Sequence, residues 1–151
     1  MEVKLIEPVS RKLNVLGKAY LAVLGNHMAH LDINRYYYPL TVIYHYDGEL
    51  TQKALAGKLG KDKSIIVKII DELTEKGFVY RQINPVDRRQ HLLGVTDKAK
   101  KTVPHIIRVF EHMNQSASKN VSAHDMEIFE SVLAKMRVNL EQFKESTSYT
   151  I

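Results

Sequence analysis

Residues 51–77 read TQKALAGKLGKDKSIIVKIIDELTEKG, and their pattern predicts two helices joined by a short turn. The first helix is expected over residues 52–59, where Ala54, Leu55 and Leu59 recur at helical spacing. Thr51 is a suitable N-cap for this helix, and Gly60 supplies a C-terminal stop.

A second helix is expected over residues 63–76, with Asp62 as its N-cap and Gly77 at its end. Its apolar residues follow helical spacing and predict one buried stripe, formed by Ile66, Ile69, Ile70 and Leu73. Two helices of about three turns with so short a connection have the geometry of a helix-turn-helix.

The residues after this pair predict a β-hairpin. Residues 78–83 are rich in strand formers, residues 84–87 read as a turn, and residues 91–95 can return as a second strand. Arg88 and Arg89 then lie at or beside the tip of the hairpin. The fold class expected is mainly α with a small β-hairpin wing.

The flanking segments predict further helices. A long helix is expected over residues 9–31, and a shorter one from Pro39 through Tyr46, which Asp47 and Gly48 close.

On the C-terminal side, Thr96 can cap a helix that runs to about Ser116 and contains Pro104. Ser122 with Asp125 opens a last helix over residues 123–144, and residues 145–151 are expected to fray.

Composition limits the class of protein. A chain of 151 residues with 44% hydrophobic and 26% charged residues is expected to fold as one soluble domain. It has no cysteine, which excludes disulfides, thiolate metal sites and thiol redox switches. Without a secretory signal pattern or an apolar stretch long enough to span a membrane, the expected location is the cytoplasm.

The positive charge is concentrated in the middle of the sequence. Residues 49–101 hold 12 Lys and Arg against 7 Asp and Glu, whereas residues 1–48 hold 5 against 4 and residues 102–151 hold 5 against 6. A polyanion is the natural partner of such a segment, and a merely solvated basic surface is the alternative.

The second helix of the pair offers residues for reading DNA. Lys63, Ser64, Val67 and Lys68 are expected to face outward together, opposite the buried stripe. In a major groove Lys63 and Ser64 would hydrogen-bond base edges, Val67 would meet a thymine methyl, and Lys68 would contact a base or a phosphate.

Phosphate and minor-groove contacts are expected from neighbouring positions. Thr51, Lys53, Lys58 and Lys61 suit sequence-independent phosphate contact, and Arg88 and Arg89 suit a minor groove. Asp87 is expected to hold Arg89 in a fixed pose through a carboxylate–guanidinium bond.

These motifs give the chain a resemblance to the multiple-antibiotic-resistance regulator (MarR) family. The residues that carry it are Leu50 to Ala56, Leu59-Gly60, Asp62 to Ser64, Asp71 to Leu73, Lys76 to Val79, Asp87 to Arg89 and Val95-Thr96. The sequence departs from the family pattern at Ile65 and Val67, near which Thr or Ser is usual, and at Val95, where Leu is usual.

The resemblance implies a single MarR-like domain over residues 1–151. Residues 36–101 would form a winged helix-turn-helix lobe that binds double-stranded DNA at a palindromic operator. Residues 1–34 and 102–151 would form a helical dimerisation region with a second copy of the chain. The apolar faces of the terminal helices also favour a homodimer independently, because a small lobe cannot bury all of them.

A repressor released by a small phenolic or lipophilic anion is the function that the resemblance implies. Candidate ligand-binding residues are the aromatic and histidine side chains near the second helix: His27, His30, Tyr36, Tyr37, Tyr38 and Tyr44. The alternatives are a zinc-type metal-responsive regulator, and a winged-helix protein-interaction module that does not bind DNA. No catalytic motif is present, so neither an enzyme nor a cofactor is expected.

Overall fold

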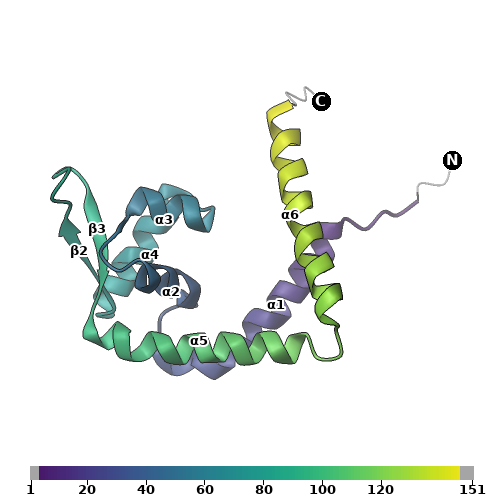
Figure 1. Cartoon of the computed structure of the whole chain (residues 1–151), viewed down its shortest axis with the longest axis horizontal. Coiled ribbons are helices and arrows are strands. Elements are labelled where there is room, and N and C mark those ends of the chain that lie inside the picture. Colours follow the sequence, from purple (N-terminus) through teal and green to yellow (C-terminus); the bar gives the residue numbers. More distant parts are fainter. Residues whose placement is uncertain (1–3, 147–151) are drawn as a thin grey trace. The chain divides into compact units, whose positions relative to one another are not determined.

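The computed structural model describes residues 4–146, which are mainly helical with one small antiparallel sheet (Figure 1). In chain order the elements are α1 (Val9–Met28), the 3-10 helix η1 (Ala29–Leu31), α2 (Tyr37–His45), β1 (Leu50–Thr51), α3 (Gln52–Leu59), α4 (Lys63–Glu75), β2 (Val79–Ile83), β3 (His91–Val95), α5 (Asp97–Ala117) and α6 (Ala123–Ser146). The mainly α fold with a small β wing is confirmed.

The chain divides into two compact units, residues 1–113 and residues 114–151. The boundary falls inside α5, so the first unit holds α1 to most of α5, and the second holds the end of α5 and α6. The expected division into a lobe of residues 36–101 and a dimerisation region of residues 1–34 and 102–151 concerns assembly with a second chain and stays a prediction.

The helix-turn-helix forms as its sequence predicts, with one difference at a cap. Thr51 Oγ1 accepts a hydrogen bond of 3.1 Å from the Ala54 amide and so caps α3. Gly60 ends α3 in the left-handed conformation, at a φ of 58° that favours glycine. Asp62 precedes α4 with extended backbone, but its side chain makes no capping hydrogen bond, so the expected side-chain cap was wrong.

The stripe expected on α4 is buried. Ile66, Ile70 and Leu73 have no exposed surface, and Ile69 retains 1%. They belong to a continuous apolar core that also includes Leu55 of α3, Phe78 and residues from α2, β3 and α5. Burial of this stripe fixes which face of α4 remains outside.

The sheet contains a short strand that the sequence did not predict. Its strand order is β1-β3-β2, with all pairs antiparallel. Val79 pairs with Val95 and Ile83 with His91, while Leu50 of the added strand pairs with Leu93. The sheet therefore ties the hairpin to the start of α3.

The helix α2 begins earlier than expected. It starts at Tyr37 rather than Pro39, so the proline lies in its first turn, where its missing amide donor is tolerated. The residues just before α2 turn sharply, because Asn34 and Arg35 both have positive φ angles, of 46° and 65°. The helix ends at His45.

The two C-terminal helices begin at the expected caps. The Ala99 amide donates to Thr96 Oγ1 at 3.3 Å, and the Asp125 amide donates to Ser122 Oγ at 3.0 Å. α5 continues through Pro104 without ending. α6 continues to Ser146, and the rest of the segment expected to fray, residues 147–151, lies outside the described residues.

Many apolar side chains of the terminal helices are exposed in the single chain. Among the described side chains of α6 not one is buried, and Phe143 and Leu140 are 56% and 66% exposed. In α1, Leu24 and Met28 are buried, whereas Val9, Leu13 and Leu16 of the same expected stripe are exposed.

No helix within residues 4–146 combines the length and the apolar character that crossing a membrane requires.

Candidate nucleic-acid interface

The outward side of α4 carries the polar residues that the sequence placed there. Lys63, Ser64 and Lys68 are all exposed. Val67 differs from the expectation, because it is only partly exposed. Ile65 is instead 45% exposed, so the more accessible apolar residue in this half of the helix is one that sequence reasoning did not select.

Charge changes sign along α4. Lys63 and Lys68 lie in the N-terminal half, while Asp71, Glu72 and Glu75 lie in the C-terminal half. A shallow hollow runs along this side of the helix and is lined by Ser64, Val67, Lys68, Asp71, Glu72, Glu75 and Lys76. Because the N-terminus of a helix also has a positive dipole end, the N-terminal half of α4 is the part suited to a polyanion.

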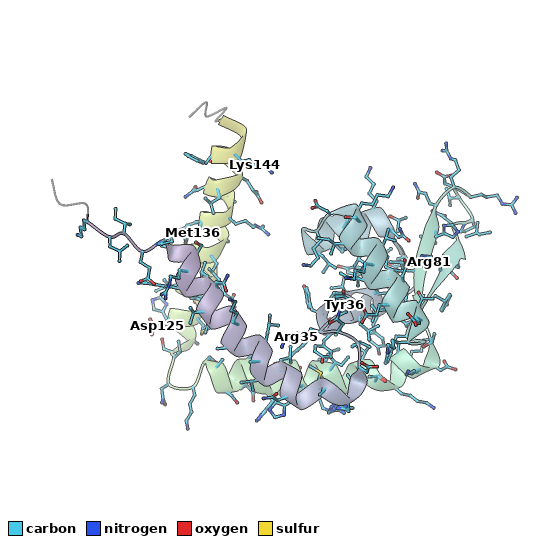
Figure 2. The ribbon with its side chains drawn as sticks, turned by 180° about the vertical axis from the view of Figure 1, so that it is seen from behind. Arg35, Tyr36, Arg81, Asp125, Met136 and Lys144 are labelled. Atoms are coloured by element: carbon cyan, nitrogen blue, oxygen red, sulfur yellow. The ribbon has the colours of Figure 1, made fainter. Side chains whose placement is uncertain are left out.

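Arg81 of β2 joins the hairpin to both helices of the pair. Its Nη2 donates to Asp71 Oδ1 at 2.6 Å, and its Nε donates to Gln52 Oε1 at 2.9 Å. Figure 2 labels Arg81 on the hairpin beside α4. Arg81 lies 29 positions from Gln52 and 10 positions from Asp71, so no local sequence pattern pointed to this network.

A second ion pair holds the C-terminal end of α4. Lys76 Nζ donates to Asp32 Oδ2 at 2.5 Å, which joins α4 to the segment that follows η1. The hydrogen bond from Lys76 holds the pKa of the Asp32 carboxyl below its usual range and raises the pKa of the Lys76 ammonium. Together with the contacts of Arg81, this ion pair connects α4 to other parts of the first unit.

The hairpin tip has the carboxylate–guanidinium contact that the sequence predicted. Arg89 Nε donates to Asp87 Oδ1 at 3.1 Å, and Arg89 Nη2 donates to Asp87 Oδ2 at 3.3 Å. The Arg89 amide also donates to Asp87 Oδ1 at 3.1 Å. The side-chain hydrogen bonds from Arg89, followed by the amide bond, lower the pKa of the Asp87 carboxyl.

The tip leaves both of its arginines accessible. The Arg89 side chain is 90% exposed even though it is paired, and Arg88 is also exposed. An Asx turn, in which the Val86 amide donates to Asn84 Oδ1 at 2.9 Å, shapes the tip. The hairpin therefore presents two guanidinium groups, one of them held in a defined direction.

The lysines on and after α3 are not equivalent. Lys53 and Lys61 are exposed, as phosphate contact requires. The Lys58 side chain is also exposed, but its ammonium lies 4.1 Å from the centre of the Tyr46 ring, in a cation–π contact. Thr51 is partly buried, and its hydroxyl caps α3.

The tyrosines expected near a ligand have different environments. Tyr37 is buried, its hydroxyl donates to the Met28 carbonyl at 3.2 Å, and burial raises the pKa of this phenol. Tyr36, labelled in Figure 2, and Tyr44 are partly buried, and Tyr38 is 60% exposed. Tyr37 thus has a clear packing role, Tyr36 and Tyr44 also pack against the core and keep part of their surface accessible, and only Tyr38 of the four is mainly exposed.

The histidines form a pair that was not predicted. The ring centre of His30 lies 5.8 Å from the ring centre of His105 on α5. His27 and His30 are both exposed. Across the described residues, no three His, Asp or Glu side chains come together in a way that could hold a metal ion.

Comparisons with known proteins agree with this geometry. Residues 40–91 match the model of the MarR family, a segment that includes α3, α4 and most of the hairpin. An uncharacterized HTH-type transcriptional regulator of Bacillus subtilis (strain 168), YdgJ, is 28% identical over 130 residues, which is 86% of this chain and 75% of YdgJ.

Solved structures share the fold over nearly the whole chain. The transcriptional regulator SlyA superposes with a TM-score of 0.84 at 24% identity, covering 93% of this chain and 100% of that one. A putative MarR family regulator from Listeria monocytogenes, solved with a 26mer DNA, gives a TM-score of 0.81 at 20% identity over 97% of this chain and 100% of its own.

The matched segment and the shared fold cover the helix-turn-helix and the hairpin described above. Residues 40–91 of the chain therefore match the MarR family model, and the chain shares the fold of these solved regulators.

Proposed function

We propose that this chain is a DNA-binding homodimer that regulates transcription at a palindromic operator. The observation that carries the proposal is the outward face of α4, where Lys63, Ser64 and Lys68 are exposed beside a hairpin that presents Arg88 and Arg89. A helix with exposed N-terminal polar residues fits the major groove, and arginines on a hairpin fit the adjacent minor groove.

The charge pattern of α4 gives the helix a direction in the groove. Phosphates attract Lys63 and Lys68 and repel Glu72 and Glu75, so the N-terminal half of α4 is the part that enters the major groove. Asp71 is already paired with Arg81, which reduces its repulsion. This polarity favours the docking in which first-turn residues meet base edges.

The exposed apolar side chains support the homodimer. Five such residues on one side of α6 have 40% or more of their surface exposed: Ile128, Phe129, Val132, Leu140 and Phe143. Because apolar patches of this kind mark interaction surfaces, we propose that a second copy covers them. A two-fold dimer then reads half-sites about 34–36 Å apart, one turn of DNA.

A gel-shift titration with the DNA upstream of the protein's own gene tests the function at two salt concentrations. We expect binding that weakens steeply with salt, because each phosphate contact releases counterions. Lys68→Ala is expected to lower the slope of log affinity against log salt by about 1 if Lys68 contacts a phosphate. Lys119→Ala is the matched control, since Lys119 is an exposed lysine outside the interface.

Absence of binding, or an affinity that does not depend on salt, would leave the winged fold without a role on DNA. The outcome would then favour the protein-interaction module. The exposed basic residues at five positions argue against that alternative, because a protein-interaction module need not retain them: Lys53, Lys63, Lys68, Arg88 and Arg89.

Removal of α6 tests the homodimer. A chain truncated before Ala123 is expected to lose the soluble dimer, which analytical ultracentrifugation of the full and truncated chains would detect. A truncated chain that remains a stable, folded monomer would refute the assembly through the terminal helices.

The regulatory part of the proposal is a repressor that a phenolic or lipophilic anion releases from DNA. Tyr36, Tyr38 and Tyr44 support it, because they place accessible aromatic surface and hydroxyl groups on one short helix and its cap. A thermal-shift screen of phenolic acids, fatty acyl compounds and divalent metals tests it, followed by gel shifts with each compound that raises the melting temperature. A compound that stabilises the protein without releasing DNA would contradict the release mechanism.

A further inference from the structure

Ile65 differs from the other isoleucines of α4. Ile66, Ile69 and Ile70 retain at most 1% of their surface, whereas Ile65 is 45% exposed. It is the third residue of α4 and so belongs to the half of the helix that the charge pattern directs toward DNA. A single exposed apolar residue is ordinary on a protein surface, and only its position on this helix makes it informative.

The neighbours of Ile65 on the helix surface are polar. Lys68 is three positions further on, which places it next to Ile65 on the helix, and Ser64 is also exposed. Val67 lies on the other side of the Ser64–Lys68 row and is only partly exposed. Ile65 therefore presents an apolar, branched surface at the edge of an otherwise hydrophilic face.

The major groove offers one apolar group to such a side chain. Guanine, cytosine and adenine present hydrogen-bond donors and acceptors there, whereas thymine also presents its C5-methyl group. An isoleucine has no donor or acceptor and would leave a polar base edge without a partner. Contact with a thymine methyl is thus the favourable arrangement for Ile65 at a base edge.

We propose that Ile65 is a specificity-determining residue that selects thymine at one position of each half-site through its C5-methyl group. The inference rests on the proposed function, because it requires that α4 enter the major groove. It replaces the sequence-based expectation that Val67 makes this contact.

The test begins with selection of a bound sequence. The full-length protein is used to enrich duplexes from a random pool, and each thymine of the selected half-site is then replaced in turn by uracil, which lacks only the methyl group. We expect one position at which uracil weakens binding by about fourfold per half-site, the effect of burying one methyl group. Replacement in both half-sites should weaken binding by about fifteenfold if the two contribute independently.

Variants identify the residue that senses the methyl group. Ile65→Ala should bind the thymine and uracil duplexes equally, whereas Val67→Ala should keep the full uracil penalty. The salt dependence of non-specific binding and the thermal unfolding of Ile65→Ala should match the unaltered chain, because Ile65 is exposed and uncharged. Those two measurements separate a lost contact from a damaged fold.

The outcomes distinguish the inference from the function on which it rests. If no duplex is enriched and no DNA binds, both are overturned. If DNA binds but no uracil replacement matters, or if Ile65→Ala keeps the uracil penalty, the inference alone is overturned. A penalty lost in Val67→Ala and kept in Ile65→Ala would assign the contact to Val67.

Discussion

The first unit and α6 contain apolar residues at similar helical spacing, yet the two regions use them differently. In the first unit the stripe on α4 is buried under α3, the hairpin and neighbouring helices, and the exposed side carries cations. In α6 no described side chain is buried, and Phe143 remains 56% exposed. The same pattern therefore forms an internal core in one region and an uncovered surface in the other.

This difference separates two kinds of exposed side chain. Exposed apolar residues on α6 gain by contact with protein, and exposed lysines and arginines of the winged region gain by contact with a polyanion. Substitutions in the two regions are expected to alter different measurements: the dimer dissociation constant in one, and fold stability or DNA affinity in the other.

The largest effect is expected from Val132→Asp. Val132 is 45% exposed in the single chain, so an aspartate there is harmless to a monomer. In a homodimer that covers this face, each copy would bury an unpaired carboxylate at a cost of several kcal/mol. Sedimentation equilibrium should show that the dimer is less stable by at least about 4 kcal/mol in total, as a raised dissociation constant.

Ala134→Asp is the matched control for that substitution. Ala134 is exposed and lies about 200° around the helix from Val132, away from the apolar face. Equal dimer dissociation constants for Val132→Asp and Ala134→Asp would show that the apolar face of α6 is not a dimer interface. The proposed distinction between the first unit and α6 would then be lost.

A smaller effect is expected from Leu73→Ala, which acts on the internal core. Leu73 has no exposed surface, and truncation should lower the free energy of unfolding by about 2–5 kcal/mol through lost contacts and a cavity. Denaturant unfolding measures it, with Ile65→Ala as the exposed counterpart on the same helix. If both variants lose the same stability, the burial pattern of α4 is wrong.

Arg89→Ala acts on DNA affinity and not on the fold. Its side chain is 90% exposed, so the dimer and the melting temperature should be little changed. Operator binding should weaken by about 1–3 kcal/mol, as measured by fluorescence anisotropy. Arg137→Ala on α6 serves as the control, and unchanged affinity in Arg89→Ala would mean that the hairpin does not touch DNA.

The smallest effect concerns the protonation of Asp87. Arg89 lowers the pKa of this carboxyl from its usual 3.8, so pairing stabilises the hairpin above that pH and is lost as pH falls through the lowered value. Carboxyl NMR titration should show the Asp87 pKa rising toward 3.8 in Arg89→Ala. No change in that variant would show that Arg89 does not hold the carboxylate in solution.

Local signals made much of the fold predictable. Thr51, Gly60, Thr96 and Ser122 act at helix ends through nearby backbone groups, so a short stretch of sequence contains the whole interaction. The Asp87–Arg89 contact spans two positions and was predicted for the same reason.

Long-range features were not predictable in this way. The strand β1 exists because Leu50 pairs with Leu93, and Arg81 bonds to Gln52 and Asp71 across the fold. Helical spacing also did not determine whether Ile65 or Val67 is more exposed, because both lie at the flanks of the outward face. That ranking depends on what packs around α4.

α5 runs as one helix from Asp97 to Ala117, across the boundary between the two units at residue 113. In a continuous α-helix, each inserted residue turns everything that follows by about 100° and advances it by about 1.5 Å. One residue inserted between Val103 and Ile106 would therefore rotate Ile106 and Met113 by about 100° away from the buried face that they share with Ala99 and Val103. The length of this helix thus matters to the core of the first unit as much as its composition does.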